Sequence, residues 1–242
     1  MNYFPVSLDI SSRRCIVIGG GKVAARKVKS LLACQGAVTV ISPALDDELL
    51  LLSRRESIRW LERGYRQGDL SDAFLVIAAT DDVAVQEAVY QEATARNILL
   101  NVADVPKWCN FILPATVRRG DLTISVSTAG QSPALAKQLR EDLEKEYSDD
   151  YDLLLQVLGR LRPIVLDMGL PHEKNKILFA NLLHRDMIDW LRQQNWQALT
   201  AHIRAILGKD VPLEDLIGQA AQKTPAPGEE LLDGQALRRC EN

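Results

Sequence analysis

A glycine-rich turn is the part of this sequence whose residue types and spacing point most directly to chemistry. Residues 19–24 read GGGKVA, which fits the pattern G-x-G-x-x-G/A with alanine in the last place. In this pattern Gly19 permits a tight turn and Gly21 lets the backbone approach a pyrophosphate, while Ala24 allows close packing of helix on strand. The N-terminus of the following helix offers N–H groups to the phosphates. The pattern predicts a dinucleotide site, against the alternative of a merely structural turn.

The next apolar segment, residues 37–42, ends without the acidic residue that usually binds the adenosine ribose. Ser42, or the backbone at Pro43 and Ala44, is the substitute that the sequence offers. No arginine stands at this strand end to hold a 2′-phosphate, which favours NAD mildly. From these residues alone, the choice between NAD and NADP stays open.

Polar residues also follow two later apolar segments. Thr80, Asp81 and Asp82 follow the fourth, and Asp104 closes the fifth. In open α/β sheets the ligand lies beyond the carboxyl ends of the strands. We therefore count Thr80 among the cofactor contacts and expect Asp104 to face the nicotinamide side of the crevice. The alternative for Asp81 and Asp82 is a helix N-cap, and for Asp104 a turn aspartate ahead of a proline.

These positions need a parallel sheet to bring them together, and the sequence has the pattern of one. Apolar strands are expected at residues 14–18, 37–42, 58–64, 74–80 and 98–104. Helical periodicity fills the intervals, from Val23 to a stop at Gly36, over 44–56, and from Asp81 and Asp82 to about residue 96. Strands that are apolar on both faces indicate a sheet covered by helices on both sides. The expected fold is a Rossmann-type α/β domain.

The pattern changes after residue 113. Two antiparallel strands are expected within 116–128, then a helix from Pro133 to about residue 147 with Ser132 as its N-cap. Residues 151–208 are helical throughout, with a kink or break at Pro163 and a separator at 169–175. A short helix is expected in VPLEDLIGQAAQ, before a linker. The predicted division is a cofactor domain, a strand-and-helix region, a helical domain and a partly mobile tail, over residues 1–113, 114–147, 148–208 and 209–242.

Composition limits the classes of function. The 47% hydrophobic and 25% charged fractions are those of a globular protein, and the net charge of −3 gives no field that would recruit nucleic acid or an anionic membrane. Four cysteines without a C-x-x-C pair favour reduced thiols in the cytoplasm. The first residues, MNYFPVSLDI, do not have the pattern of a signal peptide, and no apolar run approaches about 18 residues, so we expect no membrane-spanning helix. The three histidines lack metal-ligand spacing, so we expect no fixed metal site.

Several longer segments resemble the precorrin-2 dehydrogenase family, which includes the N-terminal half of siroheme synthase and the bifunctional dehydrogenase/sirohydrochlorin ferrochelatases. The matching segments are FPVSLDI, CIVIGGGKVAARKVKSLL, LVIAATDD, NVADVPKWCNFILPA and ISVSTAGQSPALAKQLRE. They lie in register over roughly residues 1–145. Together they are far more specific than the glycine pattern, whereas the helical remainder resembles the family in size and character only.

The resemblance implies an interlocked homodimer with an active site in the cleft between domains. It places the family's catalytic aspartate on Asp104. It also places cofactor contacts on Lys22 and Val23 at the glycine turn, and on Pro43 and Ala44 after the second strand. Some family members carry a phosphorylated serine where this chain has Thr128, so regulation at this position stays open.

The implied reaction is the NAD-dependent oxidation of precorrin-2 to sirohydrochlorin, in which Asp104 would act as a general base or proton relay. The substrate carries many carboxylates, and candidate partners for them are Lys107, Arg118, Arg119, Lys137 and Arg140. For each of these the alternative is an ordinary surface charge. Iron insertion into the product stays open. The chain stops without the methyltransferase domain of fused siroheme synthases, so we expect another protein to supply precorrin-2.

Two other functions compete with an NAD-dependent enzyme. One is a non-catalytic sensor of dinucleotide or tetrapyrrole on the same fold, and the intact NVAD segment around Asp104 argues against it. The other is an NAD-binding regulatory module of the potassium-channel type, which the specific match beyond residue 110 disfavours.

Overall fold

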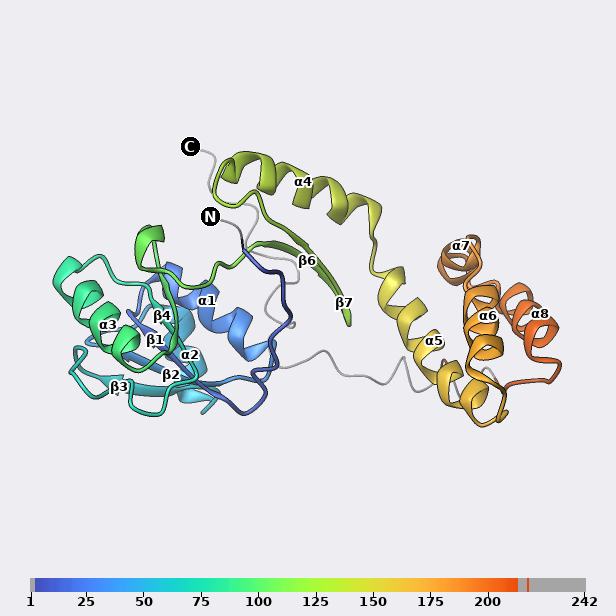
Figure 1. Cartoon of the computed structure of the whole chain (residues 1–242), viewed down its shortest axis with the longest axis horizontal. Helices are drawn as coiled ribbons and strands as arrows, with labels where there is room; N and C mark the ends of the chain where they lie inside the picture. Colours follow the sequence, from blue (N-terminus) through green and yellow to red (C-terminus); the bar gives the residue numbers. More distant parts are fainter. Residues whose placement is uncertain (1–2, 213–216, 218–242) are drawn as a thin grey trace. The chain divides into compact units, whose positions relative to one another are not determined.

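The chain folds as two compact units with separate hydrophobic cores. A computed structural model describes residues 3–212 and residue 217, and the boundary between the units falls between Leu113 and Pro114. Figure 1 shows a sheet-containing first unit and a second unit in which helices predominate. The helix expected in VPLEDLIGQAAQ lies almost wholly outside the described residues, as does most of the tail 209–242.

The first unit is built on a five-stranded parallel sheet. Its strands are β1 (Arg14–Ile18), β2 (Ala37–Ser42), β3 (Arg59–Glu62), β4 (Leu75–Ala78) and β5 (Leu99–Val102), in the order β3-β2-β1-β4-β5. The order reverses at β1, so the chain after β1 and the chain after β4 leave the same edge in opposite directions. This is the point at which an open α/β sheet binds its ligand. The expected Rossmann-type architecture is confirmed.

Helices cover both faces of this sheet. Helices α1 (Lys22–Leu32) and α2 (Asp47–Arg54) share one core with Cys15 and Val17, whereas α3 (Val83–Ala95) shares the opposite core with Ile16 and Ile18. Successive strand side chains point to opposite faces, which explains why β1 is apolar at every position from Cys15 to Ile18.

The ends of α1 and α2 differ from those expected, whereas Asp82 has the helix-capping role given above as the alternative to a cofactor contact. Helix α1 ends at Leu32, and Gln35 rather than Gly36 takes the left-handed conformation, with φ of 58°. Helix α2 is shorter than expected because Asp46 caps it by accepting the Leu49 N–H at 2.9 Å. Asp82 accepts the N–H groups of Ala84 and Val85 at 2.9 and 3.2 Å, so it is the N-cap of α3.

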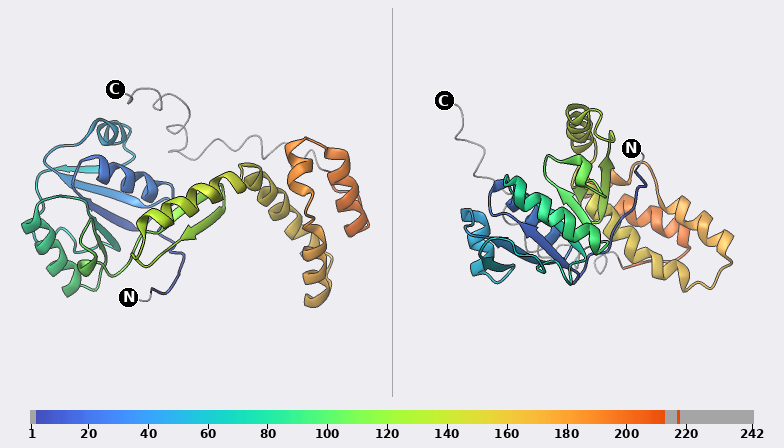
Figure 2. Two further views of the ribbon diagram at one scale, coloured as in Figure 1. Left: turned by 90° about the horizontal axis from the view of Figure 1, so that it is seen from above. Right: turned by 60° about the vertical axis from the view of Figure 1, so that its left-hand side comes forward.

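The second unit begins with an antiparallel pair of strands and a long helix. Strands β6 (Ala115–Arg119) and β7 (Leu122–Val126) form the pair, and helix α4 (Pro133–Glu146) lies along it (Figure 2). Ser132 caps α4 as expected, accepting the Leu135 N–H at 3.2 Å.

In the described part of the second unit, four further helices follow: α5 (Asp150–Leu166), α6 (His172–Leu182), α7 (Met187–Arg192) and α8 (Trp196–Leu207). Of the kink or break expected at Pro163, a break is wrong, because α5 continues through the proline to Leu166. Pro163 and Gly159 are both exposed, so water can bind the Gly159 carbonyl that proline leaves unpaired. The separator is also shorter than expected, since α6 begins at His172. Within residues 3–212, no helix is long and apolar enough to cross a membrane.

Candidate functional site

The glycine turn joins the ends of three strands, and its first glycine has a conformation that other residues avoid. Gly19 has φ of 114°, and its N–H donates to the Ile41 carbonyl at 3.0 Å. A Cβ at this position would lie 2.3 Å from the Ala79 carbonyl oxygen. Gly19 therefore lets β1, β2 and β4 converge at their carboxyl ends, as the sequence pattern predicts.

The second and third glycines of the turn have different roles. A Cβ on Gly20 would lie 1.9 Å from the Ala44 carbonyl oxygen, a close backbone approach that the sequence pattern does not identify. A Cβ on Gly21 would meet nothing within 4 Å, and Gly21 precedes α1 with no side-chain cap. The turn thus leaves space beside uncapped N–H groups at the helix N-terminus, which fits the pyrophosphate of a dinucleotide.

The other expected cofactor contacts gather around this turn. Lys22 and Val23 are exposed on the first turn of α1, and Pro43 and Ala44 are exposed after β2. Ser42 is only 7% exposed and lies under Gly20, which favours Pro43 and Ala44 as contacts after the second strand.

Thr80 lies half-buried directly after the Ala79 carbonyl that Gly19 approaches. Its own carbonyl accepts from the Gln86 side chain at 2.6 Å, and its hydroxyl accepts the Asp82 N–H at 3.3 Å. Thr80 is therefore fixed at the strand end, beside the glycine turn.

Asp104 is exposed in the loop after β5, at the same edge of the sheet. Its φ of 61° places it in the left-handed region, which is uncommon for any residue except glycine, asparagine and aspartate. The Ala103 N–H donates to the Ala78 carbonyl at 2.9 Å, so the ladder between β4 and β5 continues to the residue before Asp104. Asp104 therefore lies in a turn ahead of Pro106, which agrees with the alternative interpretation of this residue as a turn aspartate.

Lys27 is a charged residue near Asp104 that the sequence interpretation misses. It lies half-buried on α1, and this burial lowers the pKa of its ammonium below the ordinary 10.5. The positive charge of Arg26 lowers the pKa further, whereas the negative charge of Asp104 raises it. A half-buried lysine one turn beyond the cofactor contacts is therefore kept at a cost to stability.

Replacing Lys27 with methionine should raise the stability of the first unit at pH 7 by about 0.5–1 kcal/mol, because a partly buried charge is removed while the aliphatic stem is kept. Since the folded-state pKa lies below the unfolded one, wild-type stability rises as pH approaches 10.5. The advantage of Lys27→Met should therefore shrink at pH 10. Urea unfolding of wild type and Lys27→Met at pH 7 and at pH 10 measures this difference in stability.

The matched control is Lys29→Met on the same helix, where Lys29 pairs with Glu48 at 2.8 Å. This variant should gain no stability at pH 7. An equal gain in both variants would show that burial at Lys27 is not the cause.

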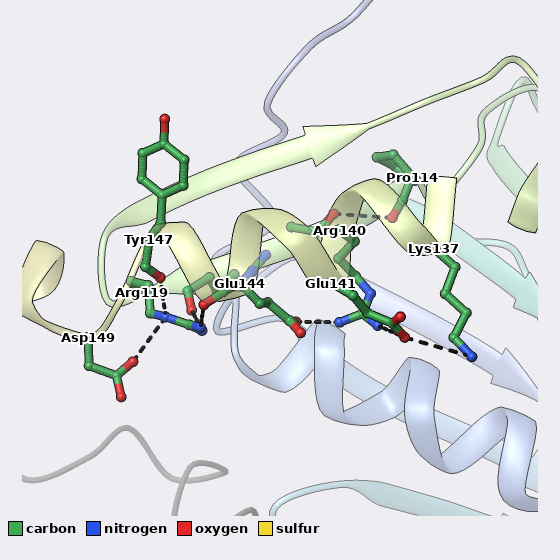
Figure 3. A network of polar contacts seen from close by, with 10 residues as sticks. Pro114, Arg119, Lys137, Arg140, Glu141, Glu144, Tyr147 and Asp149 are labelled. Atoms are coloured by element: carbon green, nitrogen blue, oxygen red, sulfur yellow. Dashed lines mark hydrogen bonds and ion pairs between the residues drawn. The ribbon is translucent and has the colours of Figure 1, made fainter. Parts of the chain in front are cut away.

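In the second unit, two of the expected substrate-binding arginines are engaged by neighbouring groups (Figure 3). Arg119 donates to the carbonyl oxygens of Tyr147 and Glu144 at 2.8 and 3.0 Å, and pairs with Asp149 at 3.1 Å. It therefore caps the C-terminal end of α4, which favours a structural role. Arg140 pairs with Glu141 at 3.1 Å and with Glu144.

The remaining candidates for substrate carboxylates are more exposed. Lys137 is 71% exposed in its side chain and lies 3.7 Å from Glu141, and Arg118 is exposed on β6. In the first unit, Lys107 lies over the Trp108 ring at 5.1 Å. Thr128 has its hydroxyl within hydrogen-bond distance of both the backbone N–H and carbonyl of Ser132. No group of three or more potential metal ligands forms within the described part of the chain.

Comparison with known proteins places both units in one family. Residues 6–115 match a family described as putative NAD(P)-binding, and residues 119–146 match the central part of sirohaem biosynthesis proteins. The siroheme synthase of Nitrosococcus oceani is 35% identical over 240 residues, which cover 98% of this chain and 51% of that protein. That of Zymomonas mobilis is 33% identical over 97% of this chain and 47% of its own length.

A solved structure agrees with these sequence matches. The precorrin-2 dehydrogenase SirC has a TM-score of 0.70 and 26% identity, covering 86% of this chain and all of that one. The chain belongs to the precorrin-2 dehydrogenase and siroheme synthase family. It spans about half the length of the siroheme synthases that it matches.

The family match and the glycine turn together identify the first unit as an NAD(P)-binding domain. The residues expected to contact the cofactor all lie at the carboxyl edge of the sheet. Asp104 lies at the same edge. The loop that carries Asp104 also contains Cys109 and Asn110, whose hydrogen bonds to β5 the sequence interpretation does not foresee.

Proposed function

We propose that this chain oxidises precorrin-2 to sirohydrochlorin with NAD⁺, in the biosynthesis of siroheme. The observation that carries the proposal is the placement of an exposed aspartate, Asp104, at the same sheet edge as the glycine turn and the uncapped N-terminus of α1. The similarity to siroheme synthases and to a precorrin-2 dehydrogenase supports this choice of substrate. We infer a cytoplasmic location from the reduced thiols expected of the sequence.

In the proposed reaction, precorrin-2 loses one hydride and one proton to give the conjugated macrocycle. When bound, NAD⁺ supplies the hydride acceptor. The carboxylate of Asp104 accepts the proton and releases it to solvent, because the side chain is exposed. The α1 N-terminus and Gly21 would hold the pyrophosphate of the bound cofactor, and Pro43 and Ala44 would contact its adenosine end.

Incubation of the protein with precorrin-2 and NAD⁺ tests this function. We expect one NADH, measured by absorbance, for each sirohydrochlorin formed. Adding ferrous or cobaltous ion in a parallel reaction shows whether the chain also inserts metal. NAD⁺ binding without any oxidation of precorrin-2 would favour the alternative, a dinucleotide or tetrapyrrole sensor.

We also propose that two copies of the chain associate through the strand-and-helix region 114–147, whereas residues 148–208 form a helical domain. Helix α4 leaves Leu135 and Leu139, one turn apart, 47% and 41% exposed, which supports an apolar contact there. Sedimentation at micromolar concentration should give about twice the 26.9 kDa of one chain.

The variant Leu135→Glu/Leu139→Glu should shift this mass to that of one chain, because two charges would be buried at the contact. Leu166→Glu, at another exposed leucine of the second unit, should leave the mass unchanged. A wild-type chain that sediments as a monomer at all concentrations overturns the proposed association.

A further inference from the structure

The turn that carries Asp104 has a backbone conformation that few residue types adopt readily. The Val105 N–H lies 3.4 Å from the Val102 carbonyl oxygen, which closes a four-residue turn with Asp104 in its third position. At this position φ is 61°, where glycine or asparagine is normally favoured. Such a conformation costs on the order of 1–2 kcal/mol and persists only where surrounding contacts hold it.

The thiol of Cys109 contacts both ends of this turn. Its sulfur accepts the Val102 N–H at 3.2 Å, and it lies 3.3 and 3.4 Å from the carbonyl oxygens of Val102 and Val105, to either of which the S–H can donate. The Asn101 amide nitrogen lies 3.7 Å from the same sulfur. One side chain thus ties together the residues two before and one after Asp104.

The neighbouring residue Asn110 fixes the position of Cys109 against the sheet. Its side-chain oxygen accepts the Leu100 N–H and its side-chain nitrogen donates to the Ile98 carbonyl, both at 2.8 Å. Its own N–H donates to the Leu100 carbonyl at 3.1 Å. Because β5 is an edge strand, Asn110 takes the place of a sixth strand and sets the register between the Cys109 segment and β5.

We propose that Cys109 is a positioning residue for the dehydrogenation: its thiol holds the Val102–Val105 turn so that the Asp104 carboxylate faces the reacting macrocycle, and Asn110 holds Cys109 in register. The role rests on the proposed function, since it acts through Asp104. The thiol undergoes no covalent chemistry in this role. It contributes only hydrogen bonds, and serine can supply these with a shorter side chain.

Steady-state kinetics with precorrin-2 and NAD⁺ test the role. Cys109→Ala should lower kcat by about 10–100-fold, the effect of displacing a reacting group by a fraction of an ångström to 1 Å, while KM and NAD affinity change less than about twofold. Cys109→Ser should recover most of the lost kcat. The control is Cys34→Ala, which removes a half-buried thiol after α1, and it should behave like wild type.

A double-mutant cycle separates positioning from a general loss of stability. In an Asp104→Asn background, Cys109→Ala should lower kcat no further, because the group that it positions is already absent. If the two substitutions instead reduce kcat by independent factors, or if Cys109→Ala keeps wild-type kcat, the positioning role is overturned.

Hydrogen exchange measures the same role without substrate. In Cys109→Ala the Val102 and Val105 amides should exchange about fivefold faster or more, because their hydrogen-bonded turn is weakened, and Cys109→Ser should restore their protection. If wild-type protein fails to oxidise precorrin-2, the proposed function fails, and hydrogen exchange still decides whether the thiol holds the Val102–Val105 turn. Unchanged exchange at both amides overturns it.

Discussion

Replacing Asp104 with asparagine is expected to lower the rate of precorrin-2 oxidation by about 10²–10⁴-fold, the usual range for losing a positioned acid or base. Asparagine keeps the size of the side chain and tolerates the left-handed backbone, with φ of 61° at this position. Melting temperature and NAD affinity should therefore stay near those of wild type. Single-turnover kinetics at saturating NAD⁺ measure the oxidation rate, and calorimetric titration measures the NAD affinity.

Asp104→Ala provides the comparison that isolates the carboxylate from the backbone. It should lose the same activity and also some stability, because alanine tolerates a positive φ less well than asparagine does. If Asp104→Asn retains more than about one tenth of the wild-type rate, proton transfer does not depend on this carboxylate. If it fails to bind NAD, the residue has a structural role that its exposure does not suggest.

A second large effect is expected at Gly20, where a single methyl group meets backbone. In Gly20→Ala the Cβ would lie 1.9 Å from the Ala44 carbonyl oxygen, and a carbonyl in the chain after β2 has little freedom to move. We expect a loss of about 3 kcal/mol in the free energy of unfolding of the first unit and at least a hundredfold loss of NAD affinity, because relief of the clash displaces the turn. Denaturant unfolding and calorimetry measure these changes.

Gly21 is the matched control one residue away, since a Cβ there meets nothing within 4 Å. Gly21→Ala should keep wild-type stability. Gly21→Asp should also fold, but its negative charge beside the pyrophosphate should lower NAD affinity at least tenfold, roughly 1.4 kcal/mol. Equal stability of Gly20→Ala and Gly21→Ala would contradict the close approach between the glycine turn and the chain after β2.

Much of the first unit can be predicted from the sequence because its strands are buried on both faces. The β1 and β2 bounds, Arg14–Ile18 and Ala37–Ser42, are those that the apolar runs predict. Helix ends are harder, since they depend on a single capping hydrogen bond, as at Asp46. At Pro163 the sequence suggests a helix end that the structure does not have. A proline normally ends a helix, but an exposed one is tolerated where water can bind the freed carbonyl.

The candidate site also has features that the sequence predicts and features that it does not. The glycine spacing predicts the turn after β1, where Gly19 has a positive φ that other residues avoid, and the family resemblance singles out Asp104. The close approach of Gly20 to Ala44 and the bonds from Cys109 to the Asp104 turn depend on residues that are distant along the chain or unremarkable in type. The cysteine in particular carries no signal in the sequence, because an isolated thiol is more often a small core residue.

The Asn110 side chain also has a consequence for how this protein behaves when it is crowded. An edge strand normally offers a row of open N–H and C=O groups on which another chain can assemble. On β5 and the residue before it, the outward groups of Ile98 and Leu100 are already bound by Asn110. Another chain at high concentration therefore finds these groups on β5 already occupied. The residue that sets the register at the candidate site thereby also hinders intermolecular strand pairing at this edge of the sheet.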